Sequence, residues 1–152
     1  MKYPYLLALC FFIATSSFTV EPVVQKSSEV SSFKKIGEFE FRTLTYDYTL
    51  TNDSIQHFNT QPLIIIFEAA WCSQCRKSLP IYEALATEYK SKLTFYRINF
   101  DEEKQLAETL GVHQLPTVMF FPVKGNPKFL VGYVSKEEFV AVMDQIHLME
   151  MK

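Results

Sequence analysis

An unbroken apolar run, Leu63-Ile64-Ile65-Ile66-Phe67, is the feature of this sequence that most restricts its fold. A strand with water on one face alternates apolar and polar residues, whereas a run without alternation is typical of a strand covered on both faces. Such strands belong to sheets with helices on either side. The chain has 152 residues, 48% of them apolar, which suffices for one well-filled core but not for two ordinary domains. We therefore expect one α/β domain.

Two cysteines, Cys72 and Cys75, follow this strand almost directly and stand at the start of a predicted helix. Apolar residues at helical spacing from Leu79 to Tyr89 indicate the helix, with Pro80 as a kink inside it. The thiolate is the nucleophile in disulfide exchange, and a helix N-terminus stabilises its charge through free N–H groups and the helix dipole. Cys72 is nearest the open first turn. Cys75, one turn further in, is placed to resolve a mixed disulfide formed by Cys72.

Further helices and strands are expected on both sides of this unit. Loose alternation between Phe39 and Leu50 predicts one or two strands, and Asn52 or Asp53 can cap a short helix through Phe58. After the cysteines, the pattern predicts a strand over Leu93–Phe100, a helix capped by Asp101 that stops at Gly111, a strand over Thr117–Phe121 and a return strand over Phe129–Val134. Ser135 and Glu138 form a capping box that opens a last helix.

The N-terminal segment has the three parts of a secretory signal peptide: Lys2, the apolar stretch Tyr5–Ala14, and Thr15-Ser16-Ser17. The apolar stretch of roughly ten residues is well short of the ~20 that a membrane-spanning helix needs. We expect a signal peptide over residues 1–19, cleaved between Ala14 and Val20, and hence a periplasmic or secreted protein. An N-terminal membrane anchor and a lipoprotein acylated at Cys10 stay open as alternatives. Residues 20–35 predict a flexible linker, and the folded domain is expected over residues 36–150.

Loss of Cys10 with the signal would leave Cys72 and Cys75 as the mature chain's cysteines. A disulfide between residues three apart closes so small a loop that it stabilises a fold by only roughly 2 kcal/mol, so chemistry explains the pair better than stability.

Other kinds of partner find little support in the sequence. Fifteen basic and seventeen acidic residues are mixed along the chain, which argues against nucleic acid as a partner. Zinc would need two more ligands, and the histidines are scattered. Haem attachment would need a histidine where Arg76 stands. No metal or other cofactor is therefore expected.

Taken in order, Trp71-Cys72-x-x-Cys75, Pro80, Leu115-Pro116-Thr117 and Gly132 resemble the thioredoxin superfamily over residues 36–148. The resemblance implies a thioredoxin fold, in which a central mixed β-sheet is flanked by helices and the active-site cysteine pair lies at a helix N-terminus. It also implies that Pro116 is cis and lies opposite the cysteines. Trp71, Leu115 and Pro116 would then bind an extended, cysteine-bearing substrate segment.

The same resemblance implies a thiol-disulfide oxidoreductase that acts on cysteine-containing proteins. Together with the signal-like N-terminus, it leads us to expect exported proteins as substrates, and we expect the chain to be a monomer. Ser73 and Gln74 between the cysteines are neutral and do not supply the charge that stabilises the reduced form of strong oxidants, which favours a reductase. A reductase in an oxidising compartment needs a membrane thiol protein as electron donor. A disulfide oxidase or isomerase, and a binding or chaperone module without turnover, remain the alternatives.

One departure from the family concerns the buried acid that thioredoxins have six residues before the first cysteine. Ile66 occupies that position, so the usual proton acceptor for Cys75 is missing. Glu68 lies two residues further along the strand and therefore on the same face. We hypothesise that Glu68 takes over proton transfer, paired with Arg97. The alternative is that Glu68 forms only a surface ion pair.

Overall fold

The computed structural model describes residues 33–46 and 59–150, with side chains up to residue 145. In chain order the elements are β1 (Phe33–Lys35), α1 (Glu38–Leu44), β2 (Leu63–Glu68), α2 (Ser73–Glu88), β3 (Thr94–Asn99), α3 (Lys104–Thr109), β4 (Thr117–Phe121), β5 (Lys128–Val131) and α4 (Lys136–Glu150). The strands form one five-stranded sheet in the order β1-β3-β2-β4-β5. The expected mixed sheet flanked by helices is confirmed.

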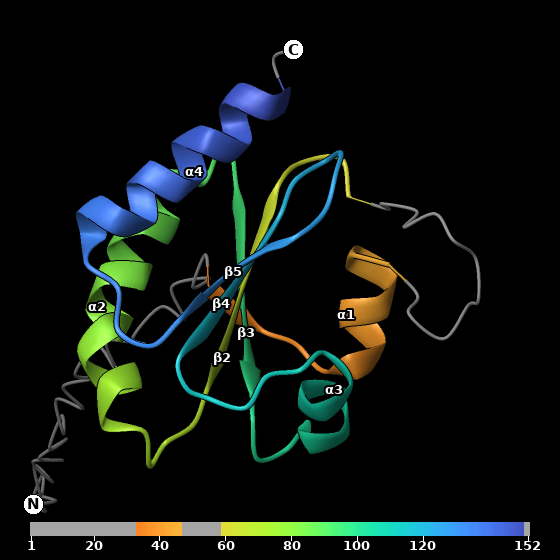
Figure 1. Cartoon of the computed structure of the whole chain (residues 1–152), viewed down its shortest axis with the longest axis vertical. Helices are drawn as coiled ribbons and strands as arrows, with labels where there is room; N and C mark the ends of the chain where they lie inside the picture. The colour runs from red at the N-terminus through yellow and green to blue at the C-terminus, as the bar shows by residue number, and fades with distance from the viewer. Residues whose placement is uncertain (1–32, 47–58, 151–152) are drawn as a thin grey trace, which may run out of the picture.

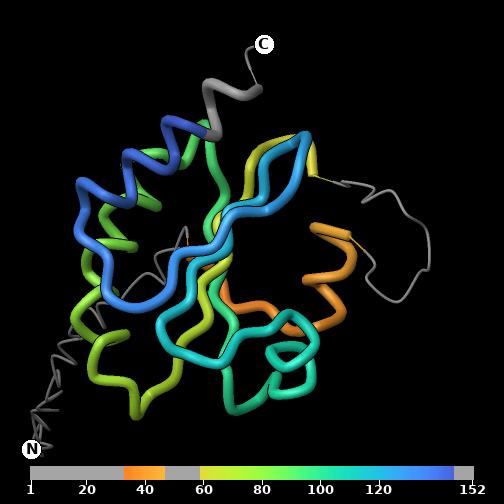
Figure 2. Tube along the Cα trace, viewed as in Figure 1, coloured from red at the N-terminus to blue at the C-terminus, as the bar shows by residue number. Residues whose placement is uncertain are grey.

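The directions of the strands bring three loops to one end of the sheet. β1, β2 and β3 run parallel, and β4 is antiparallel to both β2 and β5. Glu68 at the end of β2 pairs with Asn99 at the end of β3, and Phe67 pairs with Thr117 at the start of β4. The segments after β2, after β3 and before β4 therefore meet. Figure 2 shows β2 turning into α2 at the same end where β3 leads into α3.

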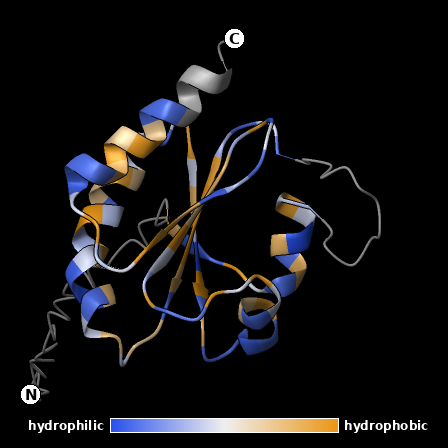
Figure 3. Cartoon of the chain, viewed as in Figure 1, coloured by the Kyte–Doolittle hydropathy of each residue, from blue (hydrophilic) through white to orange (hydrophobic). Residues whose placement is uncertain are grey.

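The helices cover the sheet on both faces. Figure 1 views the sheet nearly edge-on, with α2 and α4 on one side and α1 and α3 on the other. Alternate β2 residues enter the two layers: Ile64 and Ile66 pack with the residues of α2 and α4, and Ile65 and Phe67 pack with those of α1 and α3. All four are at most 1% exposed, which confirms a strand buried on both faces. Figure 3 shows apolar residues concentrated along the strands, between the helical layers.

Phe139 of α4 is the centre of the first apolar layer. Its ring lies 5.5 Å from that of Tyr82, 6.2 Å from that of Phe95 and 5.0 Å from that of Phe120, measured between centroids. It thus joins α4 to α2, β3 and β4. α4 begins as expected: the Ser135 hydroxyl accepts from the Glu138 N–H at 3.2 Å, and the Glu138 carboxylate accepts from the Ser135 N–H at 3.0 Å.

The strands expected from Phe39 are wrong where the structure describes them, because Glu38–Leu44 form helix α1. The alternation of EFEFRTL suggested a strand, but only Phe41 is buried, and Phe39 is 77% exposed. Gly37 precedes the helix: its N–H donates to the Glu40 carboxylate at 3.2 Å, and its carbonyl accepts from the Phe41 N–H. The rest of that expected stretch, and the helix expected over Asn52–Phe58, lie outside the described residues.

Three expected boundaries also need correction. The linker expected through residue 35 is wrong at its end, because Phe33–Lys35 form β1 and pair with β3. Asp101 does not cap α3, which begins at Lys104 after Glu103. The return strand is Lys128–Val131, not Phe129–Val134, because Gly132 follows it with a φ of 88°. The signal peptide lies outside the described residues. No helix within residues 33–46 and 59–150 is long and apolar enough to span a membrane.

Candidate active site

Cys72 and Cys75 lie at the N-terminus of α2 and are joined by a disulfide, with their Cα atoms 5.3 Å apart. Cys72 is the N-cap residue: its Sγ accepts a hydrogen bond from the Cys75 N–H at 3.0 Å. A free N–H of the first helical turn thus points at the sulfur, where it stabilises negative charge once the disulfide is reduced. The expected position of the pair is confirmed, and the geometry suits Cys72 as the attacking thiolate.

Both cysteines are covered, at 5% and 4% exposure, but an exposed aromatic side chain lies next to them in the chain. Trp71 is 63% exposed, and its indole Nε1–H donates to the Asp101 carboxylate at 2.8 Å. Asp101 follows β3, and Trp71 follows β2, so the two come from adjacent strand ends. This bond holds a large apolar surface beside the disulfide.

The segment before β4 also reaches the cysteines. Leu115 packs against the cluster formed by Ala69, Cys72 and Cys75. The Leu115–Pro116 peptide bond is cis. The Pro116 carbonyl accepts from the Gly132 N–H at 2.7 Å, which ties this segment to the residue after β5. Leu115 is thus brought to the cysteines that Trp71 precedes in the chain, and Pro116 follows Leu115 directly.

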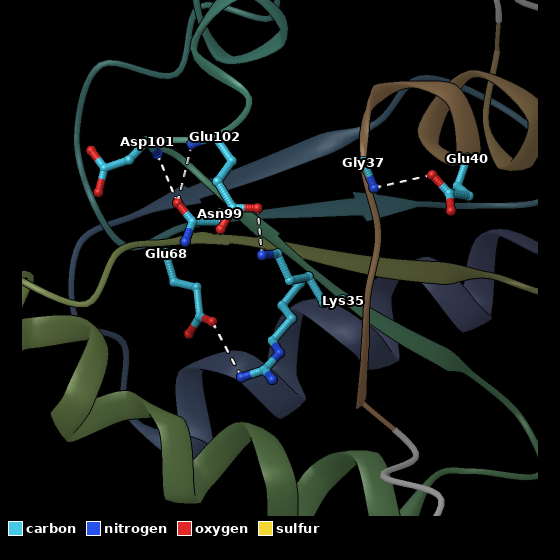
Figure 4. Close-up of polar contacts among 8 residues, drawn as sticks. Lys35, Gly37, Glu40, Glu68, Asn99, Asp101 and Glu102 are labelled. Atoms are coloured by element: carbon cyan, nitrogen blue, oxygen red, sulfur yellow. Dashed lines mark hydrogen bonds and ion pairs between the residues drawn. The ribbon is translucent and has the colours of Figure 1, made fainter.

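Glu68 forms the expected ion pair with Arg97, with 3.4 Å between its Oε1 and the guanidinium NH1. Its side chain is 24% exposed and points to the face of the sheet that α2 covers (Figure 4). Ile66 packs on the same face. The Arg97 guanidinium also lies over the Phe33 ring, 5.9 Å from its centroid. The Glu68 carboxylate is thus held at the sheet end that leads to the cysteines. Its role in proton transfer stays a prediction.

Two further hydroxyl groups follow Cys75 along the buried side of α2. Ser78 and Tyr82 are at most 2% exposed, and neither hydroxyl has a hydrogen-bond partner within 3.5 Å among the described residues. Burial raises the pKa of Tyr82, and the nearby Ser78 hydroxyl lowers it to a smaller extent. Ile66 belongs to the same apolar cluster as Tyr82, so the buried strand residue next to these hydroxyls on the α2 side of the sheet is apolar.

Asp101 is the site residue whose role the sequence did not reveal. It was expected to cap a helix, but its carboxylate holds Trp71 instead, and its N–H donates to the Asn99 side chain at 2.9 Å. Its position directly after β3, the neighbour of the strand that leads to the cysteines, is the signal that could have indicated this. Across the described part of the chain, no three His, Cys, Asp or Glu side chains are grouped so as to hold a metal ion.

Comparison with known proteins agrees with the fold and the cysteine pair. The family model described as Thioredoxin matches residues 43–145. A thioredoxin of Borreliella burgdorferi is 37% identical over 105 residues, which cover 68% of this chain and 88% of that protein. A thioredoxin of Alicyclobacillus acidocaldarius is 31% identical over 100 residues, or 64% of this chain and 95% of that one.

Solved structures lead to the same fold. The crystal structure of a chloroplastic thioredoxin z superposes with a TM-score of 0.64 over 76% of this chain and 95% of that one, at 20% identity. A thioredoxin of Malassezia sympodialis superposes with a TM-score of 0.59 at 26% identity, over 76% of this chain and 90% of that one.

Proposed function

Because this chain belongs to the thioredoxin family of thiol-disulfide oxidoreductases, we propose that it is a reductase of disulfides in cysteine-containing exported proteins. The observation that carries the proposal is the Cys72 sulfur at the N-terminus of α2, with the Cys75 N–H directed at it. The neutral Ser73 and Gln74 support the reducing direction, because strong oxidants need extra stabilisation of their reduced form.

The reaction moves two electrons from the protein dithiol to the substrate. The Cys72 thiolate attacks one sulfur of the substrate disulfide, which forms a mixed disulfide and releases the other substrate sulfur as a thiolate. Cys75 then loses its proton and attacks Cys72, which breaks the mixed disulfide and releases the second substrate thiolate. The protein is left with the Cys72–Cys75 disulfide. Both released thiolates take up protons.

Trp71, Leu115 and Pro116 line the approach to the cysteines and bind the substrate around its disulfide in this proposal. The exposed indole of Trp71 offers an apolar platform, and Leu115 packs against the cysteine cluster. The chain acts as a monomer. The compartment is the periplasm or the exterior, on the strength of the signal-like residues 1–19, and a membrane thiol protein returns electrons to the disulfide.

The test is reduction of insulin by the protein in the presence of dithiothreitol, together with the equilibrium potential of Cys72–Cys75 against glutathione. We expect faster precipitation of insulin chains than with dithiothreitol alone, no acceleration by Cys72→Ser, and a potential nearer to that of thioredoxins than of strong oxidants. Equal rates for wild type and Cys72→Ser would indicate a binding module without turnover. A potential close to that of strong periplasmic oxidants, about −120 mV, would indicate an oxidase instead of a reductase.

A further inference from the structure

One serine on the buried face of α2 has a hydroxyl that the fold does not use. The buried residues of α2 form a single stripe along the helix: Cys75, Ser78, Tyr82, Leu85 and Ala86. Ser78 follows Cys75 by about one helical turn on this face, and it is 0% exposed. Its hydroxyl has no hydrogen-bond partner within the described part of the chain. Leaving a buried hydroxyl unpaired is costly, so its presence needs an explanation.

A backbone carbonyl of the helix is the partner that such a hydroxyl usually finds. Serine and threonine inside a helix can donate to the carbonyl four residues earlier. In α2 itself, the Thr87 hydroxyl donates to the Glu83 carbonyl at 2.9 Å. In α3, the Thr109 hydroxyl donates to the Gln105 carbonyl at 2.8 Å. The Ser78 hydroxyl makes no such bond, so its proton is left for another acceptor.

The neighbour of Ser78 toward the start of the helix is Cys75. Side chains three residues apart are adjacent on a helix surface, with Cβ atoms about 5–6 Å apart, and helical side chains lean toward the N-terminus. The Ser78 hydroxyl therefore lies over the turn that Cys75 begins. Tyr82 is the neighbour on the other side: burial raises the pKa of its phenol, and the Ser78 hydroxyl offsets part of this rise.

The sulfur of Cys75 is a different hydrogen-bond acceptor in the two redox states. In the disulfide it is bonded to Cys72 and carries no charge. In the reduced protein it is a thiol that must ionise before it attacks the mixed disulfide, and a thiolate accepts a charge-assisted hydrogen bond. The Ser78 hydroxyl, unpaired in the oxidised state, thus gains a charged acceptor beside it when the disulfide is reduced.

The charged side chains at this end of the sheet already have partners. Glu68 at the end of β2 pairs with Arg97 of β3. On α2, Arg76 is exposed, and its guanidinium donates to the Ala70 carbonyl. Asp101, after β3, accepts from the Trp71 indole. The segment before β4 contributes Leu115, which does not titrate. Ser78 differs from these groups because it is buried on the same stripe as the Cys75 sulfur.

We propose that Ser78 stabilises and positions the resolving thiolate: its hydroxyl donates a hydrogen bond to Cys75 Sγ in the reduced protein and in the mixed disulfide. The inference deepens the proposed function and rests on it for the exchange reaction. The Cys75 thiolate attacks Cys72 Sγ, the bond from Cys72 to the substrate sulfur breaks, and the substrate thiolate leaves and takes up a proton. Ser78 keeps its own proton throughout, so the proton that Cys75 loses passes to another group.

The first experiment measures the Cys75 thiolate without any substrate. In a Cys72→Ser background, alkylation of Cys75 by iodoacetamide is followed from pH 6 to 11 and located by mass spectrometry. We expect Ser78→Ala to move the midpoint of the rate profile up by about one pH unit, the effect of losing a hydrogen bond to a charged group. Ser78→Thr, which keeps a hydroxyl, should restore the profile. Thr87→Ala, which removes a hydroxyl bonded to the helix backbone, should leave it unchanged.

The second experiment compares urea unfolding of the oxidised and the reduced protein at pH 9. Ser78→Ala removes an unpaired hydroxyl from the oxidised protein, so the urea midpoint should stay the same or rise. In the reduced protein the same change removes the bond to the thiolate, so the midpoint should fall. A purely structural bond between the Ser78 and Tyr82 hydroxyls would instead lower both midpoints alike, and Tyr82→Phe would reproduce the loss.

Kinetics separate this inference from the proposed function. Resolution of the mixed disulfide is followed at pH 7 by stopped-flow release of a labelled substrate thiol. We expect Ser78→Ala to resolve about threefold more slowly, because a tenfold smaller thiolate fraction is partly offset by higher intrinsic nucleophilicity, and Ser78→Thr to recover the rate. Failure of the wild type to reduce protein disulfides would overturn the proposed function alone, since alkylation and unfolding are measured without substrate.

Two results would overturn the inference. One is an alkylation profile that Ser78→Ala leaves in place or that Ser78→Thr does not restore. The other is an equal loss of stability in the oxidised and the reduced Ser78→Ala protein, which would assign the hydroxyl to a structural bond with Tyr82.

Discussion

At the scale of single residues, Ile66 is the departure from the thioredoxin pattern with the largest chemical consequence. The apolar layer behind Cys75 holds Ile66 at 1% exposure, and the nearest acidic group on the same face of β2 is Glu68. A family member without the usual acid needs another route by which Cys75 loses its proton. Glu68, fixed by Arg97 at 3.4 Å, is the candidate that the strand geometry offers.

We predict that Glu68→Gln slows the resolution of the mixed disulfide and changes its pH profile, because an amide cannot accept a proton where a carboxylate can. Resolution is followed by stopped-flow release of a thiol-labelled peptide between pH 5 and 9. Glu83→Gln, on the exposed face of α2, is the matched control and should behave as wild type. Identical pH profiles for Glu68→Gln and wild type would show that Glu68 forms only the ion pair with Arg97 and takes no part in proton transfer.

At the scale of elements, capping explains how the last helix begins. Hydrogen bonds from the Ser135 N–H and hydroxyl lower the pKa of Glu138. A carboxyl with a lower pKa in the folded protein stabilises the fold above its unfolded pKa, near 4.5, and this contribution is lost as the pH falls through the folded value. The start of α4 is thus more stable at neutral than at acid pH.

We predict that Ser135→Ala lowers the free energy of unfolding at pH 7 by about 1 kcal/mol, as loss of an N-cap does. Glu138→Gln should lower the urea midpoint at pH 7. Its midpoint should approach that of the wild type as the pH falls through the lowered folded pKa of Glu138, where the wild-type carboxylate takes up its proton. Glu137→Gln removes an acid from the same turn that is not part of the capping box, and its effect at pH 7 should be smaller. A Glu138→Gln deficit that persists unchanged at pH 3 would contradict the capping explanation.

At the scale of the whole molecule, each face of the sheet packs its own apolar layer, and Phe139 contacts most of the elements in the layer on the α4 side. We predict that Phe139→Ala costs about 3–5 kcal/mol in the free energy of unfolding, the range for truncation of a buried aromatic. Phe129→Ala is the matched control: the same substitution on the exposed edge should cost far less. Urea denaturation of both variants makes the comparison. Similar losses would show that Phe139 does not anchor α4.

The sequence predicted those parts of the fold that depend on burial and on local chemistry. The apolar run of β2, the cysteine pair at a helix start and the Ser135–Glu138 box each lie where they were expected, because each signal is contained in a few neighbouring residues. Helix α1 was missed because Phe39 and Phe41 alternate with acids as in a strand. Only the tertiary structure determines that Phe41 is buried and Phe39 exposed.

Contacts between distant segments could not be predicted in the same way. The bond from Trp71 to Asp101 depends on the order of β2 and β3 in the sheet, and the groove lined by Leu110, Phe129 and Val131 depends on the end of α3 lying beside β5. Neither leaves a local pattern in the chain. Glu68 and Arg97 were predicted to pair only because the resemblance to a known family placed them on adjacent strands.

The sulfur that caps α2 has a consequence for energetics as well as for reactivity. Cys72 terminates a helix and also changes oxidation state, so folding and reduction are two sides of one thermodynamic cycle. If the folded helix stabilises the thiolate form more than the disulfide form, the reduced and oxidised proteins must differ in their free energy of unfolding by the same amount. For a two-electron couple, about 1.4 kcal/mol of such difference corresponds to about 30 mV. Stability measured in the two redox states is therefore an independent measure of the potential.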